Sequence, residues 1–236
     1  MGIRYFDTAP LYGHGLAERE LGRFVQGRRS GLTLVTKFGI LPTPWLAAVP
    51  ALALPLLGAR AALARLGWIG EPARDYGVAE LRCSVDRSLV NLRTDYIDIL
   101  MLHEPSLAML SEPAALDEAL ADLRAAGKIR YAGISGSAEA CLEIAAQCPA
   151  AADVFQVDAT QAGVLQALRA AGREVQVSFG HLRGQARAAG PEGCIAEALR
   201  FNRTGAILFA STKLEHIREV VELIERLDAL PMEAAP

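Results

Sequence analysis

Three ionisable side chains stand at the ends of three successive runs that have the composition of β-strands. Asp7 ends IRYFD, Lys37 ends LTLVTK, and His103 follows YIDILML. In a parallel (β/α) barrel the carboxyl ends of all strands open on one face, which carries the active site. We therefore expect these side chains to meet there, and we expect Tyr12 to return to the same face through a turn that contains Pro10.

This quartet suits the reduction of a carbonyl group. A hydride delivered to a carbonyl carbon leaves negative charge on oxygen, which must be protonated or held by donors as it develops. Tyrosine is a weak acid near neutrality, with a reference pKa of about 10, but a nearby ammonium favours its ionised form. We predict Tyr12 as the acid, Lys37 as the ammonium, Asp7 as the carboxylate that holds Lys37, and His103 as the group that polarises the carbonyl oxygen.

The elements that must position these residues alternate along the chain, and such alternation is typical of repeated βα units and a parallel sheet. The predicted strands are 3–7, 32–37, 96–102, 128–135, 153–158, 174–179 and 205–211. The predicted helices are 16–28, 78–92, 113–126, 138–147, 160–171, 192–202 and 213–228. We predict an α/β fold of the parallel (β/α) TIM-type barrel with seven strands, one fewer than the standard eight.

We expect the missing strand to be the first one of the barrel. The sequence begins directly with a predicted strand, so a first βα unit is expected to be absent. An open seam would expose unpaired backbone groups, so we expect a possible homo-oligomer that covers it. The 236 residues, 52% of them hydrophobic, fit one domain spanning 1–236. The net charge of −3, with both signs spread along the chain, argues against a nucleic-acid partner.

The four cysteines form no CxxC pair, which argues against a zinc site and a disulfide framework. A reducing, cytoplasmic setting is expected, and the N-terminus lacks the pattern of a secretory signal. The chain carries no charge from 38 to 59, but four prolines interrupt that stretch, so we expect no transmembrane segment. We interpret about 40–70 as an apolar insertion that covers a pocket or a partner surface, with Trp45 and Trp68 packed within it.

Four segments resemble motifs of the aldo-keto reductase family. GIRYFDTAPLYGHGLAERELG at 2–22 resembles the segment that carries the catalytic aspartate and tyrosine, and LVTKFG at 34–39 resembles the lysine strand. SVDRSLVNLRTDYIDILMLHEP at 84–105 resembles the histidine segment, and GKIRYAGIS at 127–135 resembles the next strand. The resemblance implies a barrel enzyme that transfers hydride between a nicotinamide cofactor and an aldehyde, ketone or aldose. The sequence of residues 7–18 is similar to that of the family branch that oxidises free sugars.

The same resemblance implies contacts with NADP or NAD in the second half of the chain. They would be made by Ser135, Gln156, Phe179, Ser211, Thr212, Lys213, His216 and Arg218. The last five residues open a predicted helix, where free amides and the helix dipole favour phosphate. This half departs from the family pattern. Gly136 stands where the family has asparagine, and His216 stands where it has a basic residue for a ribose 2′-phosphate, so both NADP and NAD remain open.

Two other functions stay open. A catalytically silent barrel that binds a cofactor or a partner protein fits the expected missing unit and the weaker second half. A metal-dependent barrel hydrolase would use Asp7, His103 and Glu104, although such sites usually present more His or carboxylate ligands.

Three further groups of residues have structural interpretations. We interpret Glu18, Arg19 and Arg23 as a solvated helix face. The histidines at 14, 181 and 216 are expected on the surface or in loops, and Asp95 and Asp98 are expected to be caps or ion-pair partners.

Overall fold

The computed structural model describes residues 1–43, 70–183 and 190–228, and within them the chain divides into two compact units. One unit is Arg4–Val154, and the other contains Met1–Ile3 and the chain from Phe155 onward. The prediction of a single domain stays a prediction, and each unit is described by itself.

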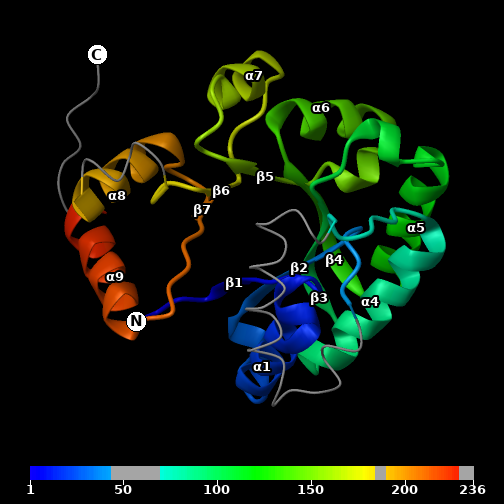
Figure 1. Cartoon of the computed structure of the whole chain (residues 1–236), viewed down its shortest axis with the longest axis horizontal. Coiled ribbons are helices and arrows are strands. Elements are labelled where there is room, and N and C mark those ends of the chain that lie inside the picture. The colour runs from blue at the N-terminus through cyan, green and yellow to red at the C-terminus, as the bar shows by residue number, and fades with distance from the viewer. Residues whose placement is uncertain (44–69, 184–189, 229–236) are drawn as a thin grey trace. The chain divides into compact units, whose positions relative to one another are not determined.

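The unit Arg4–Val154 contains four parallel strands in sequential order, each separated from the next by helix. The strands are β1 (Tyr5–Asp7), β2 (Thr33–Phe38), β3 (Ile97–His103) and β4 (Ile129–Gly136). The helices are α1 (Leu16–Val25), α4 (Val78–Leu92), α5 (Pro113–Ala125) and α6 (Ala138–Gln147). Figure 1 shows these helices along the outer side of the strands. All seven residues of β3 are buried, as expected for a parallel strand covered on both faces.

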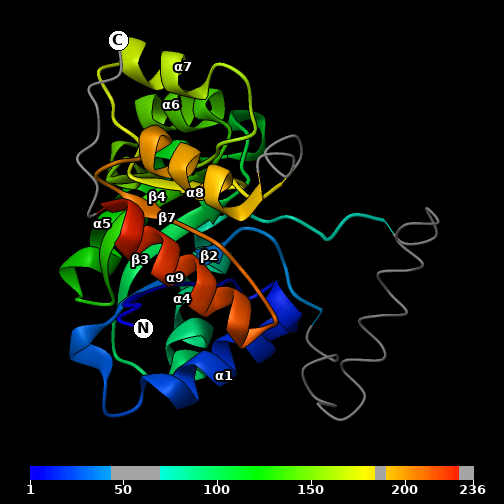
Figure 2. The same cartoon turned by 90° about the vertical axis from the view of Figure 1, so that its left-hand side faces the viewer.

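Helix α1 packs closely on α4, and Gly22 makes this possible (Figure 2). A Cβ atom at Gly22 would collide with the backbone of Asn91 and Leu92. Short 3₁₀ turns complete the connections of this unit: η1 (Tyr12–Gly15), η2 (Arg29–Gly31), η3 (Leu107–Met109) and η4 (Pro149–Ala151).

The interpretation of Glu18 as part of a solvated helix face was wrong. Glu18 lies at the contact of α1 with α4 and β2 and is fully buried. Its carboxylate accepts hydrogen bonds from Thr36 Oγ1 at 2.7 Å, Ser88 Oγ at 2.7 Å and Asn91 Nδ2 at 3.0 Å. A buried carboxylate is tolerated when such donors replace water, and donors from other elements are invisible to helical periodicity.

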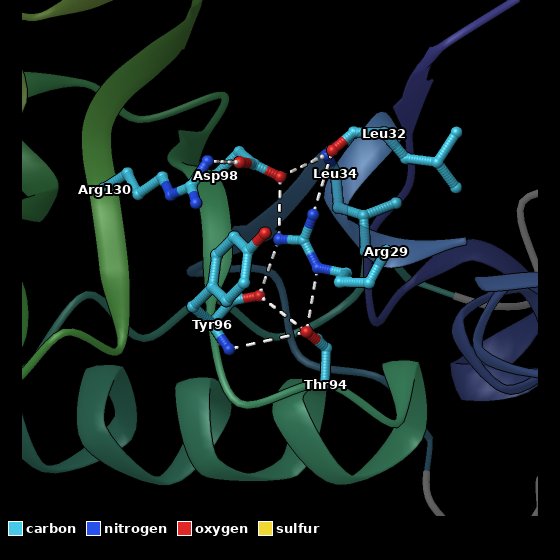
Figure 3. Close-up of polar contacts among 7 residues, drawn as sticks. All are labelled: Arg29, Leu32, Leu34, Thr94, Tyr96, Asp98 and Arg130. Atoms are coloured by element: carbon cyan, nitrogen blue, oxygen red, sulfur yellow. Dashed lines mark hydrogen bonds and ion pairs between the residues drawn. The ribbon is translucent and has the colours of Figure 1, made fainter. Parts of the chain in front are cut away.

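Asp98 joins the starts of three strands, which confirms its predicted role as an ion-pair partner (Figure 3). Its carboxylate accepts a hydrogen bond from the Leu34 amide at 2.9 Å and pairs with Arg29 at 2.7 Å and Arg130 at 2.9 Å. Both guanidinium groups also lie over the ring of Tyr96, at 3.6 and 4.1 Å from its centroid. The network therefore holds β2, β3 and β4 in register at the end opposite to the predicted catalytic residues.

The second unit contains β5 (Val154–Asp158, of which Val154 belongs to the first unit), β6 (Val177–Phe179) and β7 (Ala206–Ile207). Strands β5 and β6 are parallel, and so are β6 and β7. Its helices are α7 (Val164–Ala170), α8 (Gly190–Phe201) and α9 (Leu214–Asp228), and Figure 2 shows α8 and α9 in orange and red. The prediction of a strand over 205–211 was too long, because only two residues pair with β6.

His181 lies in the turn after β6, within the predicted surface or loop positions, and its side chain is buried. Its Nε2 lies 2.8 Å from Ser178 Oγ, which also accepts a hydrogen bond from Asn202 Nδ2 at 3.1 Å. His216 is exposed on α9, as predicted.

The predicted class, a parallel (β/α) barrel-type fold, is confirmed by parallel strands that alternate with helices through both units. The described residues contain seven strands, the predicted number. Of the predicted insertion at 40–70, residues 44–69, including Trp45 and Trp68, lie outside the described residues. In the part of the chain that is described, no helix has the length and apolar character needed to cross a membrane.

Candidate active site

The loop after β1 brings Tyr12 back toward the strand ends. The Tyr12 amide donates to Ala9 O at 3.0 Å, which closes a turn, and the next three residues adopt left-handed backbone angles. One of them, His14, lies in this loop, within the predicted surface or loop positions, and its side chain is buried. Its Nδ1 accepts a hydrogen bond from the Thr43 amide at 2.8 Å, which ties this loop to the segment after β2.

Lys37 is the centre of the predicted quartet, and its side chain is almost completely buried. Its Nζ donates to Asp7 Oδ2 at 2.6 Å, to Thr8 O at 3.1 Å and to Tyr12 Oη at 3.3 Å. The pairing register explains this meeting: Asp7 lies opposite Val35, so Lys37 is the next residue of β2 on the same face. A buried ammonium needs a paired charge and further acceptors, and these contacts supply them.

His103 is the last residue of β3 and is buried beside the phenol of Tyr12. The two rings meet edge to face, with centroids 5.8 Å apart. Burial, together with the positive charges of Lys37 and Arg74, lowers the pKa of His103 to about 3. The imidazole is therefore neutral at physiological pH and can donate a hydrogen bond without carrying charge.

The structure thus brings all four predicted residues together within one compact unit. Tyr12 is 40% exposed, whereas Lys37 and His103 are 1% and 6% exposed, so the phenol is the member of the set that a ligand can reach most easily. An accessible hydroxyl backed by a buried ammonium and a neutral imidazole can donate or accept a proton at a ligand oxygen.

The residues predicted to contact a cofactor are divided between the units. Ser135 is buried at the end of β4, opposite His103 in the register. The others belong to the second unit, where Thr212, Lys213, His216 and Arg218 are exposed, and Phe179 and Ser211 are partly exposed. Ser211 Oγ accepts a hydrogen bond from the Lys213 amide at 3.1 Å just before α9.

Gln156 lies on β5 and is 2% exposed. Its Oε1 has no hydrogen-bond partner among the described residues, and a buried acceptor of this kind is uncommon. A ligand with an N–H donor would satisfy it, so this residue fits the predicted contact with a nicotinamide cofactor.

Sequence reasoning missed two residues that contact the backbone beside His103. Tyr76 Oη donates to His103 O at 2.5 Å, and Arg74 Nη1 donates to Glu104 O at 2.8 Å. The sequence feature that could have indicated them is the segment ARDYG at 73–77, whose charged and aromatic residues come shortly after the apolar stretch at about 40–70.

The same contacts bear on the metal alternative. Glu104 forms an ion pair with Arg74, and Asp7 with Lys37. Within 1–43, 70–183 and 190–228, no group of three or more His, Cys, Asp or Glu side chains is arranged to hold a metal ion.

Known proteins resemble this chain in both sequence and fold. The model of the Aldo/keto reductase family matches residues 1–172. Over 140 residues the chain is 34% identical to the uncharacterized oxidoreductase YcsN of Bacillus subtilis, a match that covers 57% of this chain and 39% of that protein. Over 144 residues it is 34% identical to D-threo-aldose 1-dehydrogenase of a Pseudomonas species, covering 56% of this chain and 40% of that protein.

Among solved structures, the holo form of aldo-keto reductase AKR11C1 from Bacillus halodurans superposes with a TM-score of 0.72. That match has 19% identity and covers 98% of this chain and 79% of the other, so it supports the fold alone. The family model covers well over half of the chain, and the chain belongs to the aldo/keto reductase family. Its matches span less than half of the length of these curated relatives.

Proposed function

We propose that this protein is an NAD(P)-dependent oxidoreductase that transfers hydride between a nicotinamide cofactor and the carbonyl or alcohol of an aldehyde, ketone or aldose. The observation that carries the proposal is the arrangement around Lys37. Its buried ammonium reaches the carboxylate of Asp7 at 2.6 Å and the accessible hydroxyl of Tyr12 at 3.3 Å. Membership of the aldo/keto reductase family supports the same chemistry.

In the direction of reduction, a bound nicotinamide cofactor would supply hydride to the carbonyl carbon. The electron pair of the C=O π bond moves to oxygen, and Tyr12 gives its hydroxyl proton to that oxygen. Lys37 stabilises the negative charge that this transfer leaves on Tyr12, and Asp7 keeps the ammonium in place. Water then returns a proton to Tyr12. Oxidation of an alcohol follows the same steps in reverse.

His103 acts on the substrate oxygen in this proposal. Because its imidazole is neutral, it can donate a hydrogen bond to the carbonyl oxygen without competing with Tyr12 as the proton source. The ring of His103 is held beside the ring of Tyr12. A carbonyl oxygen bound between them would therefore meet a proton donor and a hydrogen-bond donor together.

Cofactor contacts are proposed for each unit by itself: Ser135 in the first unit, and Gln156, Phe179 and the start of α9 in the second. The unsatisfied Oε1 of Gln156 supports this. The exposed Lys213 and Arg218 offer positive charge to a phosphate, and NADP and NAD are both retained as candidates.

An aldose is the narrower proposal for the substrate, supported by the similarity to a D-threo-aldose 1-dehydrogenase. A homo-oligomer and a cytoplasmic location are proposed with it. Size-exclusion chromatography with light scattering tests the oligomer directly.

The test of the proposed function measures cofactor binding and turnover separately. The wild-type protein is titrated with NADPH and with NADH by nicotinamide fluorescence, and then an aromatic aldehyde or a free aldose is added. Tyr12→Phe is expected to bind cofactor like the wild type and to lose turnover by about 10²-fold or more, since it lacks the acid. Tyr131→Phe is the matched control, because Tyr131 is 55% exposed on β4. Undiminished turnover of Tyr12→Phe would refute the mechanism.

A further inference from the structure

Two side chains that follow the apolar insertion hold the backbone at the end of β3. Tyr76 Oη donates a hydrogen bond to the carbonyl oxygen of His103 at 2.5 Å. Arg74 Nη1 donates to the carbonyl oxygen of Glu104 at 2.8 Å, and Arg74 Nη2 pairs with the Glu104 carboxylate at 3.3 Å. Neither side chain belongs to the quartet, yet Tyr76 contacts the backbone of His103 and Arg74 contacts the backbone of the next residue, Glu104.

Tyr76 is itself fixed by the segment after β2. Ile40 and Arg74 form an antiparallel bridge, and the Asp75 amide donates to Gly39 O at 2.8 Å. The ring of Tyr76 lies directly against Gly39, where a Cβ atom would collide with it, and meets the ring of Phe38 edge to face at 6.1 Å. Because Phe38 and Gly39 directly follow Lys37, the same contacts link the position of Tyr76 to the end of β2.

The backbone that these side chains hold is strained. Glu104 has a φ of 49°, in the left-handed region. A non-glycine residue is disfavoured in that region and persists only where its surroundings impose it. Its amide also donates to Ser135 O at 2.7 Å, so hydrogen bonds from Tyr76 and Arg74 and the bond to β4 impose the turn together. His103 directly precedes this turn, so the same hydrogen bonds hold the backbone that carries the imidazole.

The electrostatics agree with this geometry. Burial raises the pKa of Tyr76, so its hydroxyl stays protonated and remains a donor. Charged and titratable groups face His103 from several elements: Lys37 from β2, Tyr12 from the loop after β1, Arg74 from the segment before α4, and Glu104 beside it. After burial, the positive charges of Lys37 and Arg74 contribute to the low pKa of His103.

We propose that Tyr76 and Arg74 are positioning residues that orient the imidazole of His103 toward the substrate oxygen. The proposal rests on the proposed function, since it assigns His103 a role in the reaction. It differs from that function in a testable way, because orientation and protonation of His103 can be measured without turnover.

The first experiment compares Tyr76→Phe with the control Tyr131→Phe. Tyr76→Phe keeps the ring against Gly39 and Phe38 and removes only the hydroxyl that donates to His103. We expect kcat to fall about tenfold with KM within about twofold of wild type, because small displacements of a catalytic group slow chemistry more than they weaken binding. Tyr131→Phe should match the wild type. If kcat for Tyr76→Phe stays within about twofold while Tyr12→Phe is inactive, positioning by Tyr76 is wrong and the proposed function stands.

The second experiment follows the His103 imidazole by NMR across pH, assigned with His103→Gln. Arg74→Gln is expected to raise the pKa of His103, because it removes a positive charge that opposes protonation. Arg74→Lys keeps the charge, so it should restore the low pKa while disturbing the hydrogen bond to Glu104. Tyr76→Phe should move the imidazole resonances with little change in the pKa.

These NMR results decide the proposal even if the wild-type protein shows no turnover. Imidazole signals that stay unchanged in both Tyr76→Phe and Arg74→Gln would overturn it, and displaced signals would support it. Circular dichroism of each variant verifies that the fold is retained.

Discussion

Replacement of Asp98 by alanine should destabilise the protein strongly, although Asp98 lies away from the quartet. Its side chain is 8% exposed and accepts a hydrogen bond from the fully buried Leu34 amide. Loss of that acceptor costs about 1–3 kcal/mol. The partly buried Arg29 loses its ionic partner but keeps its hydrogen bonds to Leu32 O, Tyr96 O and Thr94 Oγ1. We therefore expect the loss of this ion pair to cost about 1–2 kcal/mol.

The pair with Arg130 contributes less, because the Arg130 side chain is 56% exposed and solvent screens it. The expected loss is therefore about 2–5 kcal/mol in the free energy of unfolding, most of it from the Leu34 amide and Arg29. This is a large fraction of the total stability of a typical domain.

Urea denaturation followed by circular dichroism measures this loss, with Asp86→Ala as the control. Asp86 also accepts from a cation, Lys128 at 2.6 Å, but the two side chains are 59% and 40% exposed. We expect less than about 1 kcal/mol from the control. If Asp98→Ala also loses less than about 1 kcal/mol, water must replace the carboxylate and the reasoning from burial is refuted.

Two further predictions concern buried groups around the quartet. Glu18→Ala leaves the donors of Thr36, Ser88 and Asn91 without their acceptor and should lose about 2–4 kcal/mol, whereas Glu18→Gln keeps an acceptor and should lose about 1 kcal/mol. Chemical denaturation measures both variants, and an equal loss would contradict this account. Burial and nearby cations lower the pKa of His103 in the folded protein from 6.5 to about 3. Between about pH 3 and pH 6.5 the unfolded chain therefore binds more protons than the folded one, so the folded state loses stability as the pH falls below 6.5. Between pH 6 and pH 4 the free energy of unfolding of the wild type should therefore fall, relative to that of His103→Gln, by up to about 1.4 kcal/mol per pH unit. Urea denaturation at several pH values measures both proteins. If the two free energies change in parallel with pH, His103 is protonated in the folded state and the account is wrong.

The positions of most elements followed from local sequence. Residues 78–92 and 138–147 were predicted and observed as helices with the same bounds, because helical periodicity and flanking residues are local signals. The last strand was overestimated, since GAILFAS is apolar enough for seven residues but its neighbour β6 pairs with only two of them. Strand length depends on the partner strand, which local composition does not describe.

The quartet could also be placed from sequence, because all parallel strands of one sheet end on the same side. Asp7, Lys37 and His103 needed only that rule and the strand ends to be expected together. The sequence could not give the pairing register of β1 and β2. In that register Asp7 lies opposite Val35, and Lys37 is the next residue on the same face, so Lys37 Nζ lies 2.6 Å from Asp7 Oδ2. Register is set by pairing between strands that are distant along the chain.

What the sequence by itself determined is the family, the alternation of strands and helices, and the residue types of the quartet, three at strand ends and Tyr12 in the loop after the first strand. Only the tertiary structure decided the surroundings of these residues. Glu18 was interpreted as a surface residue because charge is a local property, whereas its burial depends on donors that other elements bring to it. Tyr76 could be recognised beside His103 only once the chain had folded, because 27 residues separate the two in sequence and a single hydrogen bond joins them in space.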